Sequence, residues 1–251
     1  MSLIRTEGIV LRNKTLGESD RLVHLFTLTH GKLKGVAKGA RRPKNRFGSA
    51  LEPITHASLF LFERRTGGLF QIQEAEIIRS FQALREDLNT IFYASHFLRW
   101  IEAFLPEGES RPTCFHLLRE FLSLLGEVKD VESLARCFEI KVLDLSGFRP
   151  RLDVCGDCGK TLERKKIYFS FLEGRGLCNN CGSQENRFHS FLSPGTVASV
   201  HQILTLYPNK VSRLHLNVLM KKELGKMTRD YAKHLLGKEI GTEQMLCHSF
   251  G

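Results

Sequence analysis

The sequence lacks the long hydrophobic runs of a membrane protein and the apolar leader of a secreted one. Its 251 residues contain no uninterrupted apolar stretch of about 18 residues, the length that a transmembrane helix needs. The first residues, MSLIRTE, do not form the apolar core of a secretory signal. We therefore expect a cytoplasmic protein that makes no contact with membranes.

Common catalytic signatures are also missing. The sequence has no G-x-x-x-x-G-K-[ST] phosphate loop, no H-E-x-x-H motif and no G-x-S-x-G nucleophile motif. Its ten histidines are scattered without the spacing of metal ligands. These absences predict a protein that is not an enzyme and has no catalytic residues.

Cysteine is scarce, but it is clustered. Four of the seven cysteines lie within 27 positions, as two C-x2-C pairs separated by 19 residues: Cys155, Cys158, Cys178 and Cys181. In a reducing compartment this spacing is typical of a four-thiolate Zn²⁺ site rather than of disulfides. Redox-active pairs or unoccupied cysteines are the alternatives.

Four thiolates would fill the tetrahedral coordination sphere of Zn²⁺ and leave no position for an activated water. We therefore expect a structural zinc, which would contribute on the order of 10 kcal/mol of apparent folding energy to residues 151–189. We expect this segment to have little core of its own. Cys114 and Cys137 lie in apolar helical patterns and are expected to be core residues.

Acidic residues are in the minority, with 27 Asp and Glu against 37 Lys and Arg, and the isoelectric point is about 9.4. The excess is uneven, because residues 1–80 carry a net charge of +7 and residues 81–150 carry −3. A basic N-terminal third suits a polyanionic partner, nucleic acid first. The alternative is a charge excess that serves only solubility.

The strongest concentration of positive charge lies in residues 32–46, which include seven cations and no acidic residue. The cations are Lys32, Lys34, Lys38, Arg41, Arg42, Lys44 and Arg46. Phe47 follows directly and is either a platform for a base or a core residue, and Arg64 and Arg65 would extend the surface. Cations along a groove with an aromatic platform are typical of a single-stranded nucleic-acid site, whose affinity depends on salt.

Hydrophobic periodicity divides the chain into a β part and a helical part, which predicts an α+β fold. Five short strand patterns with turns between them, ending near residue 78, indicate a small closed barrel. Helical spacing follows, and Ser193 with Pro194 predicts a helix start. The expected domains are 1–80, the nucleic-acid-binding barrel; 81–150, the first helical part; 151–189, the zinc-binding insertion; and 190–251, the C-terminal helical part.

Several strings of this sequence, taken together, resemble the bacterial RecO recombination mediators. They are residues 7–11 (EGIVL), 17–21 (GESDR), 30–42 (HGKLKGVAKGARR), 145–150 (LSGFRP), 192–195 (LSPG) and 236–239 (LGKE), with Leu152 and the first cysteine pair. The resemblance spans nearly the whole chain. It implies an N-terminal OB-fold, a helical domain and a zinc-binding insertion.

The resemblance also implies a function in DNA repair. Such proteins bind single- and double-stranded DNA and anneal complementary strands without ATP. Together with RecR, they help to load RecA onto DNA coated by single-stranded DNA-binding protein, whose acidic, hydrophobic C-terminal tail they recognise. RecA-coated DNA is thus an indirect partner, and binding to DNA would place the protein at the nucleoid. The positions that match the family's DNA-contacting cations are Lys34, Lys38, Arg41 and Arg42.

Two other functions remain open at this point. The same basic barrel would serve a zinc-containing RNA-binding or transcription factor. A metal-dependent enzyme is the third hypothesis.

Overall fold

The computed structural model describes residues 3–63, 68–162, 166–183 and 189–241, without the side chains of residues 209 and 212. The chain packs as two units, Met1–Gly126 and Glu127–Gly251. The fold is mixed α+β, with a closed barrel at the N-terminus and helices after it, as the sequence predicts. Among the described residues, no helix is long and apolar enough to cross a membrane.

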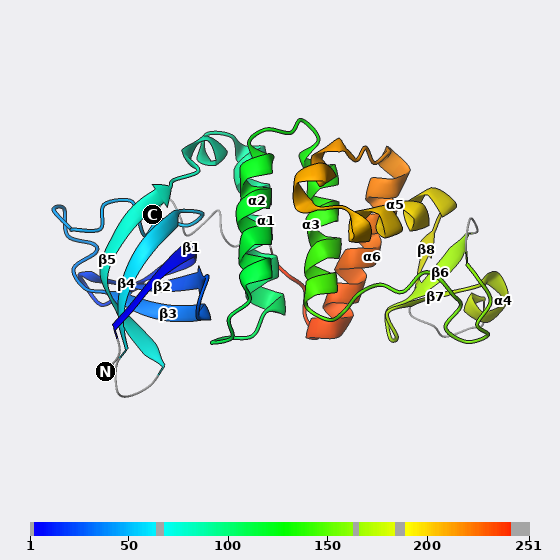
Figure 1. The fold of residues 1–251 in the computed structure, drawn as a ribbon, viewed down its shortest axis with the longest axis horizontal. Helices are drawn as coiled ribbons and strands as arrows, with labels where there is room; N and C mark the ends of the chain where they lie inside the picture. The colour runs from blue at the N-terminus through cyan, green and yellow to red at the C-terminus, as the bar shows by residue number, and fades with distance from the viewer. Residues whose placement is uncertain (1–2, 64–67, 163–165, 184–188, 242–251) are drawn as a thin grey trace. The chain divides into compact units, whose positions relative to one another are not determined.

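Five strands form the barrel: β1 (Leu3–Leu16), β2 (Asp20–Thr27), β3 (Gly31–Ala37), β4 (His56–Glu63) and β5 (Leu69–Arg79). Their order around the barrel is β1-β2-β3-β5-β4, closed by the pairing of β4 with β1. All neighbours are antiparallel except β3 and β5, which pair over three residues, Lys34–Val36 against Leu69–Gln71. This order and closure correspond to an OB-fold (Figure 1).

The barrel interior is filled by alternating apolar residues from its strands, among them Val10, Val23, Leu25, Leu59 and Ile72. The connection between β3 and β4 adds residues to this core, because its chain folds back over the barrel end. Residues of this connection in the core are Ala40, Phe47 and Leu51. Buried side chains therefore hold the connection at Ala40, within the basic segment, and at Phe47, directly after it.

The first unit continues with a short 3-10 turn, η1 (Gln82–Arg85), and two helices, α1 (Leu88–Phe104) and α2 (Pro112–Leu125). Asp87 caps α1 by accepting a hydrogen bond from the backbone N–H of Thr90 at 2.8 Å. Phe115 of α2 packs on the barrel, with its ring centroid 5.8 Å from that of Phe26 and 5.7 Å from that of His56. The helix α2 thus packs directly against the barrel.

The second unit contains α3 (Val131–Leu145), α5 (Pro194–Thr205), the 3-10 segment η2 (Pro208–Arg213) and α6 (Val218–Leu236). Ser193 caps α5 and Pro194 is its first residue, as the sequence predicts. The last helix begins only at Val218, because Asn217 caps α6 and the 3-10 segment η2 precedes it. The side chains of Cys137 in α3 and Cys114 in α2 are both buried, as expected.

Between α3 and α5 the chain forms a small sheet of β7 (Arg175–Leu177), β6 (Ile167–Ser170) and β8 (His189–Leu192), in that order, with a short helix α4 (Asn179–Gly182). The prediction of little core was wrong, because this segment buries its own apolar residues. They include Leu152, Leu162, Ile167, Phe169 and Leu177. The Phe169 ring also packs against Tyr231 of α6 at 5.2 Å between centroids, which joins the sheet to the helices.

Candidate metal centre and nucleic-acid interface

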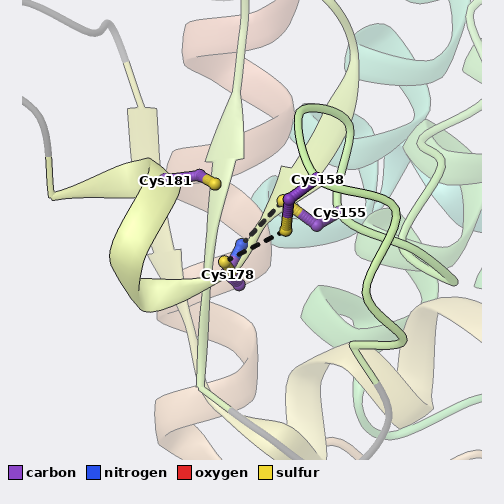
Figure 2. Close-up of side chains that lie close together, drawn as sticks. All are labelled: Cys155, Cys158, Cys178 and Cys181. Carbon is purple, nitrogen blue, oxygen red and sulfur yellow. Dashed lines mark hydrogen bonds between the residues drawn. The ribbon is translucent and has the colours of Figure 1, made fainter.

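The four predicted cysteine ligands converge on one point in the second unit. Cys155 and Cys158 lie in the turn before β6, Cys178 is the residue before α4, and Cys181 lies within α4. All four sulfur atoms lie within 4.8 Å of one another, and Figure 2 shows them drawn together from these two segments. The geometry brings together the two C-x2-C pairs and forms a group that could hold a metal ion.

Sulfur separations in this cluster fit a tetrahedral metal centre. Zn–S bonds of about 2.3 Å in tetrahedral geometry place neighbouring sulfurs about 3.8 Å apart. The Sγ atoms of Cys158 and Cys178 are 3.8 Å apart, and the backbone N–H of Cys178 donates to Cys155 Sγ at 3.4 Å (Figure 2). Amide donors of this kind stabilise a thiolate, so the donor set suits a thiophilic cation.

The pKa values of the thiols indicate why this cluster favours a cation. Burial raises the pKa of Cys155, but the backbone N–H groups of Cys158, Cys178 and Asp157 outweigh it and lower the pKa to about 6. Hydrogen bonding to Cys178, and then to the other sulfurs, raises the pKa of Cys181 to about 12. A positive charge at the centre of the cluster would therefore favour ionisation of these thiols together.

Glycines permit the close chain approaches that form this centre. Gly159 has a φ of +69°, a left-handed conformation that closes the first turn after Cys158. A Cβ at Gly182 would lie 2.3 Å from Tyr168 Cδ2, so glycine there lets α4 approach β6. The sequence thus encodes both the ligands and the backbone that brings them together.

The predicted basic segment divides into parts with different surroundings. On β3, Lys32 and Lys34 point to the same side, as strand alternation predicts, and both meet other residues of the first unit. Lys32 is half-buried, its Nζ donates to the carbonyl oxygen of Glu102 at 2.5 Å, and burial lowers its pKa. Lys34 forms an ion pair with Glu107, with 2.8 Å between Nζ and Oε1. These two cations are therefore engaged within the protein.

The remaining predicted cations lie in the exposed connection after β3. They are Lys38, Arg41, Arg42, Lys44 and Arg46. The start of this connection is fixed, because the backbone N–H of Gly39 donates to Asp20 at 2.8 Å and that of Arg41 to the Ser19 carbonyl at 2.9 Å. Arg41 Nη1 also donates to the carbonyl of Glu18 at 2.9 Å. The structure thus presents a positively charged surface on an ordered loop.

The structure does not support a role for Phe47 in the predicted interface as a platform for a base. Its side chain is 4% exposed and belongs to the barrel core, so the ring has no free face on which a base could stack. The core alternative is the one that the structure bears out, and Arg46 covers the ring with its guanidinium 4.9 Å from the centroid. Arg64 and Arg65 lie outside the described residues.

A second basic site lies between α3 and α6, where the sequence reasoning placed no binding residue. A pocket of about 360 Å³ is lined by Glu132, Arg136, Val218, Lys221, Lys222, Gly225, Lys226 and Arg229. Arg136 donates to the buried Glu139 at 2.9 Å, while its Nε is buried without a hydrogen-bond partner among the described residues. The spacing of the cations in α6 could have indicated a basic helix face in the sequence. Their convergence with Arg136 could not be predicted, because it depends on the packing of two helices that are distant in sequence.

The fold and the cysteine cluster together define the class of this protein. It combines an OB-like barrel with helices and with a four-cysteine cluster that could hold a metal ion. The family model described as "Recombination protein O N terminal" matches residues 1–81, and "Recombination protein O C terminal" matches residues 85–244. The chain therefore belongs to the RecO family.

Curated relatives agree with this assignment over nearly the whole chain. The chain is 32% identical over 230 residues to "DNA repair protein RecO" of Alkaliphilus metalliredigens, covering 91% of this chain and 92% of the relative. It is 33% identical over 241 residues to the protein of the same name from Symbiobacterium thermophilum, covering 95% and 93%. Identity to the Geobacter metallireducens protein of that name is 39% over 182 residues, covering 72% and 74%. Membership supports a role in DNA repair and recombination and implies DNA binding in that role.

Proposed function

We propose that this protein is a DNA-binding recombination mediator, which anneals complementary strands without ATP and, with RecR, helps to load RecA onto single-stranded DNA coated by its binding protein. The observation that carries the proposal is the exposed, carboxylate-free run of five cations from Lys38 to Arg46, on the barrel of a RecO-family chain. Binding at this surface would depend mainly on phosphate contacts.

Charge neutralisation is the physical basis of the proposed annealing. Two strands repel each other through their phosphates, and this repulsion opposes the first base pairs. Cations on a fixed loop lower the repulsion while leaving the bases free to pair, and no covalent bond changes. This role is proposed to need neither ATP nor a catalytic residue.

The four cysteines are proposed to hold a structural Zn²⁺. Four sulfur ligands would close the coordination sphere, and the metal would fasten the turn that carries Cys155 to α4. The cation would also remove the repulsion that opposes ionisation of the four thiols.

The pocket between α3 and α6 supports the proposed recognition of the acidic, hydrophobic tail of single-stranded DNA-binding protein. Five cations and one carboxylate line it, which suits an acidic peptide, although Arg136, Lys221 and Lys226 also form ion pairs within the unit. Val218 at its edge is 80% exposed and offers apolar contact. We propose that the carboxylates of the tail meet these cations.

The test of the proposed DNA surface is the double substitution Lys38→Ala with Arg42→Ala. Each lost phosphate contact makes log affinity depend less steeply on log salt, so the slope should become shallower by about 1.4 units for single strands and about 1.8 for duplex, with weaker strand annealing. Arg5→Ala with Lys14→Ala is a matched control, since it removes two exposed barrel cations outside the segment. Equal effects of the two variants would contradict the proposal.

Competition between single-stranded DNA and RNA of the same sequence separates the proposed role from that of an RNA-binding factor. We expect DNA to compete at least as well as RNA. A strong preference for RNA would favour the alternative.

A further inference from the structure

The segment that follows α1 lies along the first half of β3, on the side that no barrel strand covers. β5 pairs with β3 only from Lys34 onward. Beside the earlier residues, Lys32 and Glu107 form a parallel bridge, and the backbone N–H of Gly108 donates to the Lys32 carbonyl at 2.8 Å. Backbone contact therefore holds residues 107–109 (EGE), here called the acidic strap, against the strand that opens the basic segment.

The approach of the acidic strap is close enough to require glycine in β3. Gly31 has a φ of +62°, and a Cβ at this position would lie 1.9 Å from the carbonyl oxygen of Glu109. The strap thereby places Glu107 next to Lys34, with the 2.8 Å ion pair between them. A carboxylate of the same chain therefore pairs with a cation that the sequence predicts to contact phosphate.

Lys32 and Lys34 differ in how easily they could change partners. Lys32 is half-buried and its ammonium donates to a backbone carbonyl, so releasing it would leave polar groups unpaired. The side chains of Lys34 and Glu107 are 37% and 62% exposed, and ion pairs at such positions are weak and readily exchanged. A phosphate arriving from solvent could replace Glu107 at Lys34, but could not replace the partner of Lys32.

We propose that the acidic strap is an internal competitor of the DNA backbone, in which Glu107 masks Lys34 until a phosphate displaces it. This inference rests on the proposed DNA-binding function of the basic segment. The strap lowers affinity for nucleic acid through one specific contact and makes Lys34 available only where phosphates are dense, as on a strand already bound by Lys38 to Arg46.

Glu107→Gln tests the mask with little change in shape. The backbone bridge to Lys32 remains, while the charge that holds Lys34 is lost. We expect affinity for a single-stranded oligonucleotide to rise about fivefold at low salt, and the salt slope to steepen by about 0.7 because one phosphate contact is gained. Glu109→Gln is the matched control, since Glu109 lies two residues away and pairs with Arg111 at 2.7 Å instead.

A double-mutant cycle with Lys34→Gln tests whether the gain depends on the ion pair between Lys34 and Glu107. Glu107→Gln should give no gain when Lys34 is already neutral. Equal gains from Glu107→Gln and Glu109→Gln, or a gain that persists without Lys34, would overturn the mask, because either would reflect net charge alone. Unchanged binding by Glu107→Gln would also overturn it, provided that thermal unfolding shows both variants folded.

Failure of the mask and failure of the proposed function give different results. If Lys38→Ala with Arg42→Ala weakens binding while Glu107→Gln changes nothing, the DNA surface stands and only the mask fails. If the double variant binds like the wild type, the DNA lies elsewhere and both fail.

Discussion

At the scale of single residues, Lys32, Lys34 and Lys38 lie within seven positions of one another, yet their ammonium groups have three different environments. Lys32 is held by a backbone carbonyl, Lys34 by a carboxylate, and Lys38 is exposed. Strand alternation explains why the first two share a side, and the end of β3 explains why the third leaves it. Charge in the sequence is thus a poor measure of charge available to a ligand.

His24 gives a prediction at this scale. Its side chain is 8% exposed, and burial, aided by the positive charge of Arg12, lowers its pKa to about 4 against an ordinary 6.5. Between these values the unfolded chain binds a proton that the folded chain does not, so stability falls as the pH falls from 6.5 to 4. The loss approaches about 1.4 kcal/mol per pH unit.

Urea unfolding at pH 7 and pH 5 measures this effect. His24→Gln cannot bind the proton, so the variant should lose less stability between the two pH values than the wild type does. His56 is also buried with a lowered pKa and remains in both proteins, so the difference isolates His24. The same loss in both proteins would show that His24 titrates normally in the folded state.

At the scale of elements, the cysteine segment combines a four-sulfur centre with a small sheet. The knuckles supply the sulfurs, and β6 buries Ile167 and Phe169 beneath them. The segment has a core of its own, and the proposed metal would add a cross-link between the first knuckle and α4, so loss of the metal should weaken the order of the segment. The barrel has its own core and no part in this centre.

Metal removal tests the role of this element. We expect one Zn²⁺ per chain by native mass spectrometry, and a strong chelator should abolish hydrogen-exchange protection in β6, β7 and β8 while β1 to β5 keep theirs. Cys155→Ser should lose the metal, and Cys114→Ala, which alters a buried cysteine outside the cluster, should retain it. Loss of barrel protection with the metal would contradict a local structural role.

At the scale of the whole molecule, the two units carry separate positively charged surfaces. The exposed run Lys38 to Arg46 belongs to the first unit, and the pocket between α3 and α6 belongs to the second. One is an exposed loop, and the other is a pocket of about 360 Å³ that could take the end of an acidic peptide. The proposed mediator role would require the protein to hold DNA and its coating protein at once, and two separate surfaces would permit this.

Separate variants should therefore affect the two partners independently. Lys222→Glu reverses an exposed charge in the pocket and should weaken binding of a synthetic tail peptide roughly tenfold, with little change in affinity for naked DNA. Lys210→Glu, an exposed change in the same unit outside the pocket, serves as the control. Fluorescence anisotropy with peptide and with oligonucleotide measures both, and equal loss of peptide by the two variants would argue against the pocket.

The sequence by itself determined the elements that local chemistry specifies. Strand alternation predicted the five-stranded barrel, the Ser193 cap and Pro194 predicted the start of α5, and C-x2-C spacing predicted which sulfurs meet. These features depend on neighbouring residues or on a ligand geometry that fixes the spacing. They can therefore be read without knowledge of the fold.

Only the tertiary structure decided which side chains remain available. Phe47 is buried because the connection folds over the barrel, and Lys34 is paired because a segment more than seventy residues later lies along β3. The pocket exists because Arg136 and α6 pack together. Burial and pairing depend on residues far apart in the chain, whose contacts the local pattern does not encode.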